Sequence, residues 1–326
     1  MNRPANFPEL SAYLVENIPL KDLSPQETLK SSIFITARYR TGSTYLYSLF
    51  SSLANTATFY EPLNYHLIDN LDKDDRQTQQ EKLQFAHTLK GGYLADYQFL
   101  DRKKLIKYFR REFNLTHIVM SATEQSDELK DYIHFLLSTY PPKLKVLQFN
   151  RIDFRLPWFK FNFPQALIVN LRRNPRDIYA SFVGMFLRKN PGKPQVNLEN
   201  GVETTIDDVG LNEELDALSR VFALQSLTEN LNSYQKIYLL NQLSNRWADL
   251  FADLVVEYES LIKDPIAVIT EIMSYLPTWK PNFDREFIEA KKNRINVWQE
   301  YHPNSWFKNN EIVCDELIEQ LFSKLA

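Results

Sequence analysis

The stretch from Ser32 to Leu53 constrains the fold most, because it predicts a strand, a tight turn and a helix in direct succession. The β-branched and aromatic run 32–37 is typical of a buried strand, and apolar residues three and four apart over 45–53 indicate a helix face. The turn between them, residues 38–44, has the sequence Arg-Tyr-Arg-Thr-Gly-Ser-Thr. The first turn of a helix presents backbone N–H groups without intrahelical partners, and these attract anions. We therefore predict a phosphate or sulfate site at this turn.

Gly42 is informative because the chain has only seven glycines in 326 residues, well below the average usage of about 7%. It lies where the predicted strand turns into the predicted helix. Two interpretations stay open: a simple turn residue, or a position where the missing side chain lets backbone N–H groups approach an anion.

Composition excludes several classes of function. The net charge of -3 provides no global basic field for nucleic acid, so an anion site in this chain must be local. No segment approaches the roughly eighteen apolar residues of a membrane span, and residues 1–30 lack a basic start followed by an apolar core. We therefore expect a cytoplasmic protein that does not span a membrane. The single cysteine, Cys314, excludes an internal disulfide framework and a cysteine-rich metal site.

Strands and helices are predicted to alternate along the rest of the chain, with candidate strands at 117–120, 145–149, 166–171 and 253–258. Such alternation favours an α/β fold, a three-layer sandwich with a central parallel sheet and ligands at the carboxyl ends of its strands. We expect a single domain over 1–326. Its expected additions are an N-terminal arm (1–31), a lid or acceptor loop rich in Pro, Gly, Asn and acidic residues (190–211), and a C-terminal helical tail (282–326).

The turn at 38–44 differs from a nucleotide-binding P-loop. That loop has two glycines five apart followed by Lys-Ser or Lys-Thr, because the lysine reaches the β- and γ-phosphates and the hydroxyl holds Mg²⁺. Here one glycine is present and the lysine is absent. The interpretation as a nucleotide kinase is weakened, although the strand-turn-helix arrangement is shared.

A second strand end carries Arg173-Asn174-Pro175-Arg176-Asp177, with Ser181 eight residues after Arg173. Together the two segments resemble the PAPS-dependent sulfotransferase family, in which 3'-phosphoadenosine 5'-phosphosulfate (PAPS) is used without a metal ion. Residues 40–44 are similar to the family's 5'-phosphosulfate loop in the form seen in carbohydrate and bacterial members. Residues 173–181 are similar to its 3'-phosphate motif, and 258–265 look like a third, structural family segment. The resemblance spans about 32–265 and implies a P-loop NTPase-like fold with helical insertions.

The resemblance also implies residue roles. Arg40 would neutralise the charge that grows on the leaving phosphate oxygen. Arg173 and Ser181 would hold the 3'-phosphate that distinguishes PAPS from ATP; the other interpretation of Arg173 is a surface salt bridge. The product would be 3',5'-ADP, and no metal ion is implied. The residues that would supply N–H and hydroxyl donors to the 5'-phosphate are Thr41, Gly42, Ser43 and Thr44.

An acceptor hydroxyl also needs a base near its developing oxyanion. Several branches of the family place a Glu about twenty residues after the loop, and Glu61 lies twenty-one residues after Arg40. Pro62 disfavours helical geometry at Glu61, so we expect an extended backbone there with the carboxylate towards the cleft. His66 is the alternative base. A third interpretation has Glu61 capping the chain locally or pairing with Arg38.

The chain departs from the family near its C-terminus, where cytosolic animal members carry an Arg-Lys-Gly loop for the 3'-phosphate. No glycine follows Gly210, and Lys291, Lys292 and Arg294 are candidate substitutes. Residues 150–158 follow a strand end with Arg, Asp and Trp close together, which favours either an acceptor-side segment or a structural junction.

The predicted function is direct in-line transfer of a sulfuryl group from PAPS to a hydroxyl or amine of a small molecule, lipid or carbohydrate. Two alternatives stay open: a P-loop-type nucleotide kinase, and a non-catalytic nucleotide-binding protein of the same fold. Nucleic acid is not expected as a partner. The sequence leaves the acceptor and the oligomeric state undetermined.

Overall fold

The computed structural model describes residues 30–72, 94–114, 116–141, 143–191, 198–222, 231–276, 278–279 and 295–323. These residues group into two compact units, which we describe separately. The sheet unit takes its residues from Pro25–Arg172 and Phe251–Lys291, and the helical unit takes its residues from Met1–Ser24, Arg173–Leu250 and Lys292–Ala326. The single domain expected over 1–326 stays a prediction. The expected arm lies outside the described residues except at its last two positions, and so does the basic cluster at 291–294.

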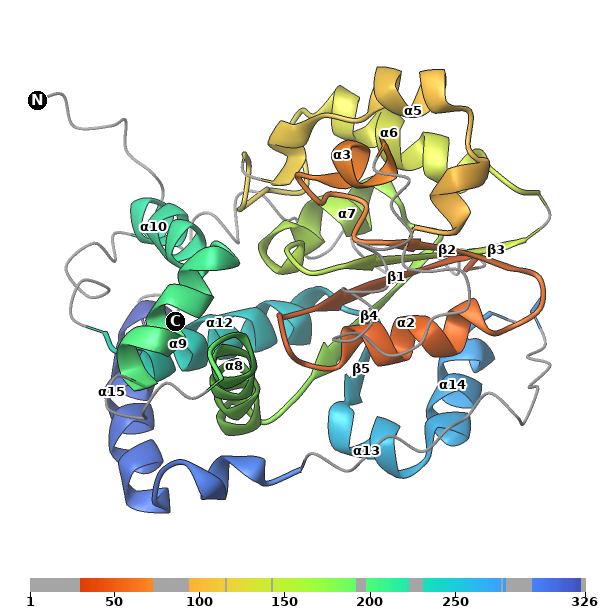
Figure 1. Ribbon diagram of the computed structural model, residues 1–326. Coiled ribbons are helices and arrows are strands. Elements are labelled where there is room, and N and C mark those ends of the chain that lie inside the picture. The colour runs from red at the N-terminus through yellow and green to blue at the C-terminus, as the bar shows by residue number, and fades with distance from the viewer. Residues whose placement is uncertain are drawn as a thin grey trace, which may run out of the picture. The chain divides into compact units, whose positions relative to one another are not determined.

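A five-stranded parallel sheet forms the centre of the sheet unit, in the order β2-β3-β1-β4-β5 (Figure 1). The strands are β1 (Ser32–Ala37), β2 (Thr56–Tyr60), β3 (Leu144–Phe149), β4 (Ala166–Arg172) and β5 (Leu254–Glu257). Every residue of the inner strand β1 and its neighbour β3 is buried, as expected where helices cover both faces of a parallel sheet. The predicted α/β fold with a central parallel sheet is confirmed.

Helices cover both faces of this sheet: α2 and α14 lie on one face, and α5, α6 and α7 lie on the other (Figure 1). The apolar periodicity over 45–53 places Leu46 and Phe50 of α2 in the core, both fully buried. The helices of the sheet unit are α2 (Ser43–Ser51), α3 (Leu67–Asp72), α5 (Arg102–Tyr108), α6 (Asp127–Ser138), α7 (Leu156–Asn162), α13 (Tyr258–Lys263) and α14 (Pro265–Ser274), with short 3₁₀ turns η1 (Asp96–Phe99), η2 (Arg111–Asn114) and η3 (Asp153–Arg155).

The strand predicted at 117–120 is wrong. His117 takes a φ of 52°, which breaks an extended chain, and the Met120 N–H donates to the Phe154 carbonyl (3.1 Å) instead of to a neighbouring strand. One edge strand of the sheet is β2, which the sequence pattern did not reveal; the other, β5, lies within the predicted strand 253–258. The strand β2 has only five residues, Thr-Ala-Thr-Phe-Tyr, and is too short and too polar to show a clear apolar run.

The helical unit consists of α8 (Pro175–Lys189), α9 (Leu198–Asp208), α10 (Leu211–Phe222), α12 (Ser233–Phe251), η6 (Val297–Glu300) and α15 (Asn304–Ser323). Asn174 caps α8 by accepting from the Arg176 N–H (3.0 Å), and Pro175 occupies the first helical position, as its fixed φ favours. The helical character expected for the tail is confirmed over α15; 282–294 lie outside the described residues.

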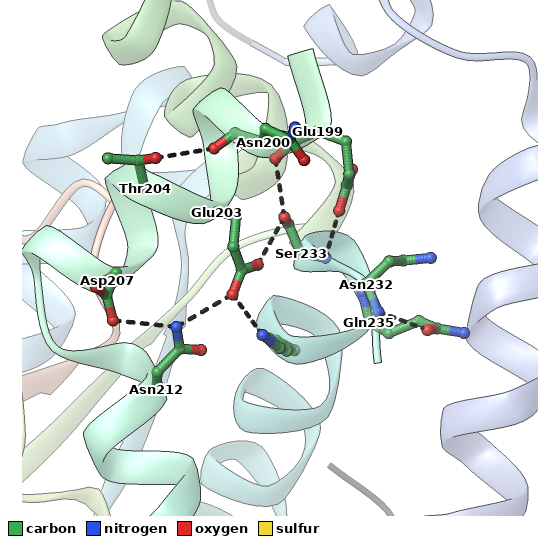
Figure 2. Close-up of polar contacts among 10 residues, drawn as sticks. Glu199, Asn200, Glu203, Thr204, Asp207, Asn212, Asn232, Ser233 and Gln235 are labelled. Carbon is green, nitrogen blue, oxygen red and sulfur yellow. Dashed lines mark hydrogen bonds and ion pairs between the residues drawn. The ribbon is translucent and has the colours of Figure 1, made fainter. Parts of the chain in front are cut away.

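The segment 190–211, expected as a lid or acceptor loop, contains the helix α9, and 192–197 lie outside the described residues. Its role as a lid or acceptor segment stays a prediction. Ser233 at the start of α12 donates its N–H to Glu199 (2.7 Å) and its hydroxyl to Glu203 (3.0 Å), as Figure 2 shows. Glu203 also pairs with Lys236 and accepts from Asn212. This network ties α9 to α12 and α10, and it explains how a stretch with many acidic residues becomes an ordered helix.

Candidate active site

Four chain segments leave the sheet at one edge, because all five strands are parallel. Arg38 follows β1, Glu61 follows β2, Asn150 follows β3 and Arg173 follows β4 in the sequence. Within the sheet unit the register aligns these ends: Tyr60 pairs with Gln148, Thr36 with Phe149 and Ala37 with Leu171. The carboxyl edge of a parallel α/β sheet is where ligands bind in such folds.

The turn after β1 opens the nine-residue helix α2 through Gly42, which takes a left-handed conformation (φ 97°). Arg40 also takes a positive φ of 68°, and the buried Thr41 hydroxyl donates to the Arg38 carbonyl (2.7 Å), which closes the turn. No side chain caps α2 and no acidic residue lies in its first turn. Its first-turn N–H groups therefore suit an anion.

Gly42 is required for two structural reasons. A side chain at φ 97° is strained, and a Cβ on Gly42 would lie 2.5 Å from ring carbons of Tyr258 at the start of α13. The tyrosine therefore packs directly on the turn, which gives residue 258 of the third family-like segment a structural role. Both reasons fit a turn residue, and approach to an anion at Gly42 stays a prediction.

A buried ion pair anchors the start of the turn. Arg38 is 4% exposed and its Nη1 donates to Asp153 Oδ2 (2.9 Å), while the Thr36 hydroxyl donates to Asp153 Oδ1 (2.7 Å). Of the two interpretations of 150–158, the structural junction holds for Asp153 and for Trp158, whose indole N–H donates to the Glu124 carbonyl (3.0 Å).

Glu61 lies in the turn after β2 and is held by amides. Its N–H donates to the Gln148 carbonyl (2.8 Å), Asn64 Nδ2 donates to Oε2 (2.9 Å), and Asn150 Nδ2 donates to Oε1. Its φ is 44°, so the extended backbone expected before Pro62 is wrong. Proline at the next position disfavours the right-handed helical region, and the chain instead makes a tight turn in which the Asn64 N–H reaches the Glu61 carbonyl (2.9 Å).

Burial raises the pKa of the Glu61 carboxyl above its ordinary value of 4.5, while hydrogen bonds from Asn64, Tyr60 and Asn150 and the charge of Arg151 oppose that rise. A carboxylate of raised pKa in a partly buried turn is a candidate for proton transfer. The alternative base, His66, is exposed, with 65% of its side-chain surface accessible, and its Nδ1 lies 3.4 Å from Asp69.

Two side chains of the turn after β1 reach the neighbouring strand ends. The Ser43 hydroxyl donates to Asn150 Oδ1 (3.4 Å), and the Thr44 hydroxyl lies 3.0 Å from the Tyr60 hydroxyl. The structure therefore brings the turn, Asn150 and Glu61 together in the sheet unit. The sequence analysis included Asn150 only within the segment 150–158 and Tyr258 only within the structural family-like segment 258–265, and it assigned no individual role to either residue. Asn150 had one usable signal, which is its position immediately after a predicted strand.

Arg173 and Ser181 belong to the helical unit. Arg173 is 7% exposed and precedes the Asn174 cap, and Ser181 lies partly buried on α8. Asp177, one turn into α8, is buried and accepts from the N–H groups of Asn296 (2.9 Å) and Trp298 (3.2 Å). That these residues complete one binding site with the turn after β1 stays a prediction.

Among the described residues, no group of three or more His, Cys, Asp or Glu side chains is arranged to hold a metal ion. Within the same residues, every helix is too short or too polar to cross a membrane. Cys314 of α15 is buried, and burial raises the pKa of its thiol to about 12, which fits a packed side chain and not a reactive one.

Residues 32–279 match a sequence model described as the sulfotransferase family. No curated protein sequence matches significantly. Solved structures similar to this chain include a sulfotransferase from Alicyclobacillus acidocaldarius, with 13% identity, a TM-score of 0.41 and coverage of 89% of this chain and 96% of the other. The sulfotransferase domain of the Synechococcus PCC 7002 olefin synthase has 17% identity, a TM-score of 0.42 and coverage of 90% and 97%. Retinol dehydratase in a complex with retinol and PAP has 14% identity, a TM-score of 0.35 and coverage of 95% and 85%.

Proposed function

The chain belongs to the sulfotransferase family, and from that premise we propose that it transfers a sulfuryl group from PAPS to a hydroxyl or amine of a small molecule, lipid or carbohydrate. The observation that carries this proposal is the turn of Gly42, which opens α2 at the carboxyl edge of the parallel sheet beside a glutamate of raised pKa. A donor-binding element and a candidate base thus lie together in one unit.

The 5'-phosphosulfate of the donor would bind the turn after β1. The chemistry of the turn fits an anion: N–H groups at the start of α2, the hydroxyls of Ser43 and Thr44, and the Arg40 guanidinium. Thr41 has another role, since its hydroxyl already donates to the Arg38 carbonyl. Arg40 would neutralise charge on the leaving phosphate oxygen.

The 3'-phosphate would be held by Arg173 and Ser181. Arg173 directly follows β4, and the end of β4 is paired with the end of β1, which precedes the turn. Neighbouring strand ends are where two halves of a nucleotide site are expected in an open α/β sheet. An arginine suits this task because its planar donors match phosphate oxygens.

Glu61 would serve as the general base. The acceptor oxygen or nitrogen forms a bond to sulfur while the bond from sulfur to the bridging phosphate oxygen breaks. The acceptor proton moves to the Glu61 carboxylate, and 3',5'-ADP leaves with the bridging oxygen. Such loose, in-line transfers depend mainly on positioning and on neutralisation of the leaving oxygen. No step needs a metal ion.

A thermal-shift comparison tests the proposal. We expect 3',5'-ADP without Mg²⁺ to raise the Tm, because a ligand that binds only the folded chain stabilises it. ATP with Mg²⁺ is expected to leave the Tm unchanged. The opposite pattern would overturn the proposal in favour of a nucleotide kinase. If 3',5'-ADP binds, a panel of hydroxylated and amine metabolites with labelled PAPS identifies the acceptor; binding without transfer to any acceptor would favour a non-catalytic nucleotide-binding protein.

A further inference from the structure

We propose that Asn150 is a positioning residue that fixes the orientation of the Glu61 carboxylate next to the turn that would bind the donor. This inference rests on the proposed function. It assigns a task to a side chain that touches both the candidate base and the candidate donor site.

The contacts of Asn150 fix the orientation of its amide. Its Oδ1 accepts from Gln148 Nε2 (2.8 Å) and from the Ser43 hydroxyl (3.4 Å), so its Nδ2 is directed to Glu61 Oε1. A flipped amide would bring the oxygen of Asn150 against the carboxylate and the nitrogen against the donor on Gln148. The contacts with Gln148 and Glu61 therefore favour the same orientation, and the Ser43 hydroxyl, which can donate or accept, is compatible with it.

Gln148 reinforces this arrangement from inside the sheet. Its side chain is fully buried on β3, and its Oε1 has no hydrogen-bond partner among the residues that the structure describes. An unsatisfied buried carbonyl is unfavourable, yet the Nε2 of the same amide is used to hold Asn150. The hydrogen bond between the buried amides of Gln148 and Asn150 thus helps to fix the orientation of Asn150.

The arrangement tolerates donor binding. The Ser43 hydroxyl has one proton, and when that proton is donated to a phosphate oxygen, the bond from Gln148 still holds Asn150. Each oxygen of Glu61 accepts one amide hydrogen bond, from Asn150 or Asn64, and Tyr60 adds a third hydrogen bond to the carboxylate. A carboxylate has about four lone-pair sites, so one is left for the acceptor proton. Asn150 therefore orients the base without occupying it.

The charged and titratable groups that face Glu61 come from three elements. They are Tyr60 on β2, Tyr97 on η1 and Arg151 after β3. Burial raises the pKa of Tyr97 well above its ordinary value, so this phenol stays neutral over the working range. Burial raises the pKa of the Glu61 carboxyl, and we assign the acidic limb of the kcat profile to this group.

The sharpest test is Asn150→Asp, which keeps the shape and replaces the N–H donor facing Glu61 by an oxygen. Two neighbouring carboxyls disfavour ionisation of both, so the acidic limb of the kcat profile is expected to move to higher pH. At a fixed pH on that limb, kcat falls roughly tenfold for each pH unit of the shift. For Asn150→Ala, which adds no charge beside Ser43, the KM for PAPS and the affinity for 3',5'-ADP are expected to stay within about twofold.

The matched control is Asn162→Asp, which makes the same chemical change in the last turn of α7, where Asn162 Nδ2 donates to the Trp158 carbonyl (3.0 Å). Its pH profile is expected to match the parent. If Asn150→Asp does not fold, Asn150→Ala is used; it removes the same donor, and its acidic limb is expected to move in the same direction. In the Glu61→Gln background, Asn150→Asp should change the pH profile little, because the group that it acts on is gone.

Two failures are distinguishable. If the parent transfers sulfate from PAPS and the acidic limb of Asn150→Asp or Asn150→Ala stays at the parental pH, the inference about Asn150 is wrong and the proposed function stands. If the parent neither binds 3',5'-ADP nor transfers sulfate, the proposed function is wrong and the inference falls with it.

Discussion

The turns after β1 and β2 lie at the same edge of one sheet and differ in electrostatic character. The turn after β1 has Arg38 and Arg40, and Arg38 forms a buried anchoring pair with Asp153. The turn after β2 centres on the Glu61 carboxylate, held by the neutral amides of Asn64 and Asn150. A group paired with a full charge is fixed in its ionised state, whereas a carboxylate among amides keeps an adjustable pKa. The first turn suits binding, and the second suits proton transfer.

The largest expected effect follows from removing the titratable group of the second turn. Glu61→Gln preserves shape and one acceptor oxygen but cannot take a proton, so we expect kcat to fall about 10²–10⁴-fold. The affinity for 3',5'-ADP, measured by calorimetry, should stay at the parental value because the donor turn is unchanged. His66→Gln is the matched comparison. A loss confined to His66→Gln would transfer the role of base to His66.

The next effect concerns stability and tests the anchor of the first turn. Asp153→Ala leaves Arg38 buried without its carboxylate, and breaking a buried pair from one side costs about 3–5 kcal/mol. Urea unfolding measures this loss. Replacing both partners, Arg38→Met with Asp153→Val, should cost less, since no uncompensated charge stays buried. Equal losses in the single and double variants would show that packing and not charge anchors the turn.

The third prediction tests whether the segment that begins at Arg173 contributes to donor binding in addition to the turn after β1. Arg173→Ala should weaken 3',5'-ADP binding by about 1.5–3 kcal/mol, the range for a hydrogen bond to a charged group. Arg172→Ala is the matched control, because Arg172 donates to Asn170 (3.0 Å) and is not assigned to the site. Calorimetric titration measures both affinities. Unchanged binding in Arg173→Ala would show that the 3'-phosphate is held elsewhere.

The first turn was predictable from the sequence because its determinants are contiguous. An apolar run, a short turn with one glycine and a helix face all lie within 32–53, so the local geometry of the chain alone brings the candidate anion-binding groups together. Glu61 was found by its spacing from Arg40, although its backbone conformation was not. The surroundings of Glu61 depend on strand register. Asn150 lies 89 positions away in sequence, and it reaches Glu61 only because β2 pairs with β3.

The same reason explains the other errors. Whether a short segment becomes a strand depends on its partners. The segment Thr56–Tyr60 forms a strand because it pairs with β3. The more apolar segment 117–120 is instead held by a hydrogen bond from the Met120 N–H to the Phe154 carbonyl. The helix α9 within the expected loop depends on Ser233 and Lys236, which follow it by about thirty residues. The hydrophobic periodicity of a segment carries no information about contacts with residues far away in the sequence.

The smallest expected effect is on stability as a function of pH, and it sharpens the contrast between the two turns. Because burial raises the folded-state pKa of Glu61 above 4.5, the folded chain binds this proton more tightly than the unfolded chain does. The stabilisation from that proton is fully present below the unfolded pKa and is lost as the pH rises through the folded pKa. Glu61→Gln has no such loss, so its Tm relative to the parent should rise from acidic to neutral pH.

The pH dependence of catalysis has the opposite sign, because the base must be ionised. The parental kcat falls as the pH drops through the same folded-state pKa. Differential scanning calorimetry and a kcat profile over one pH series measure the two responses. A pH-independent Tm difference would contradict the raised pKa of Glu61.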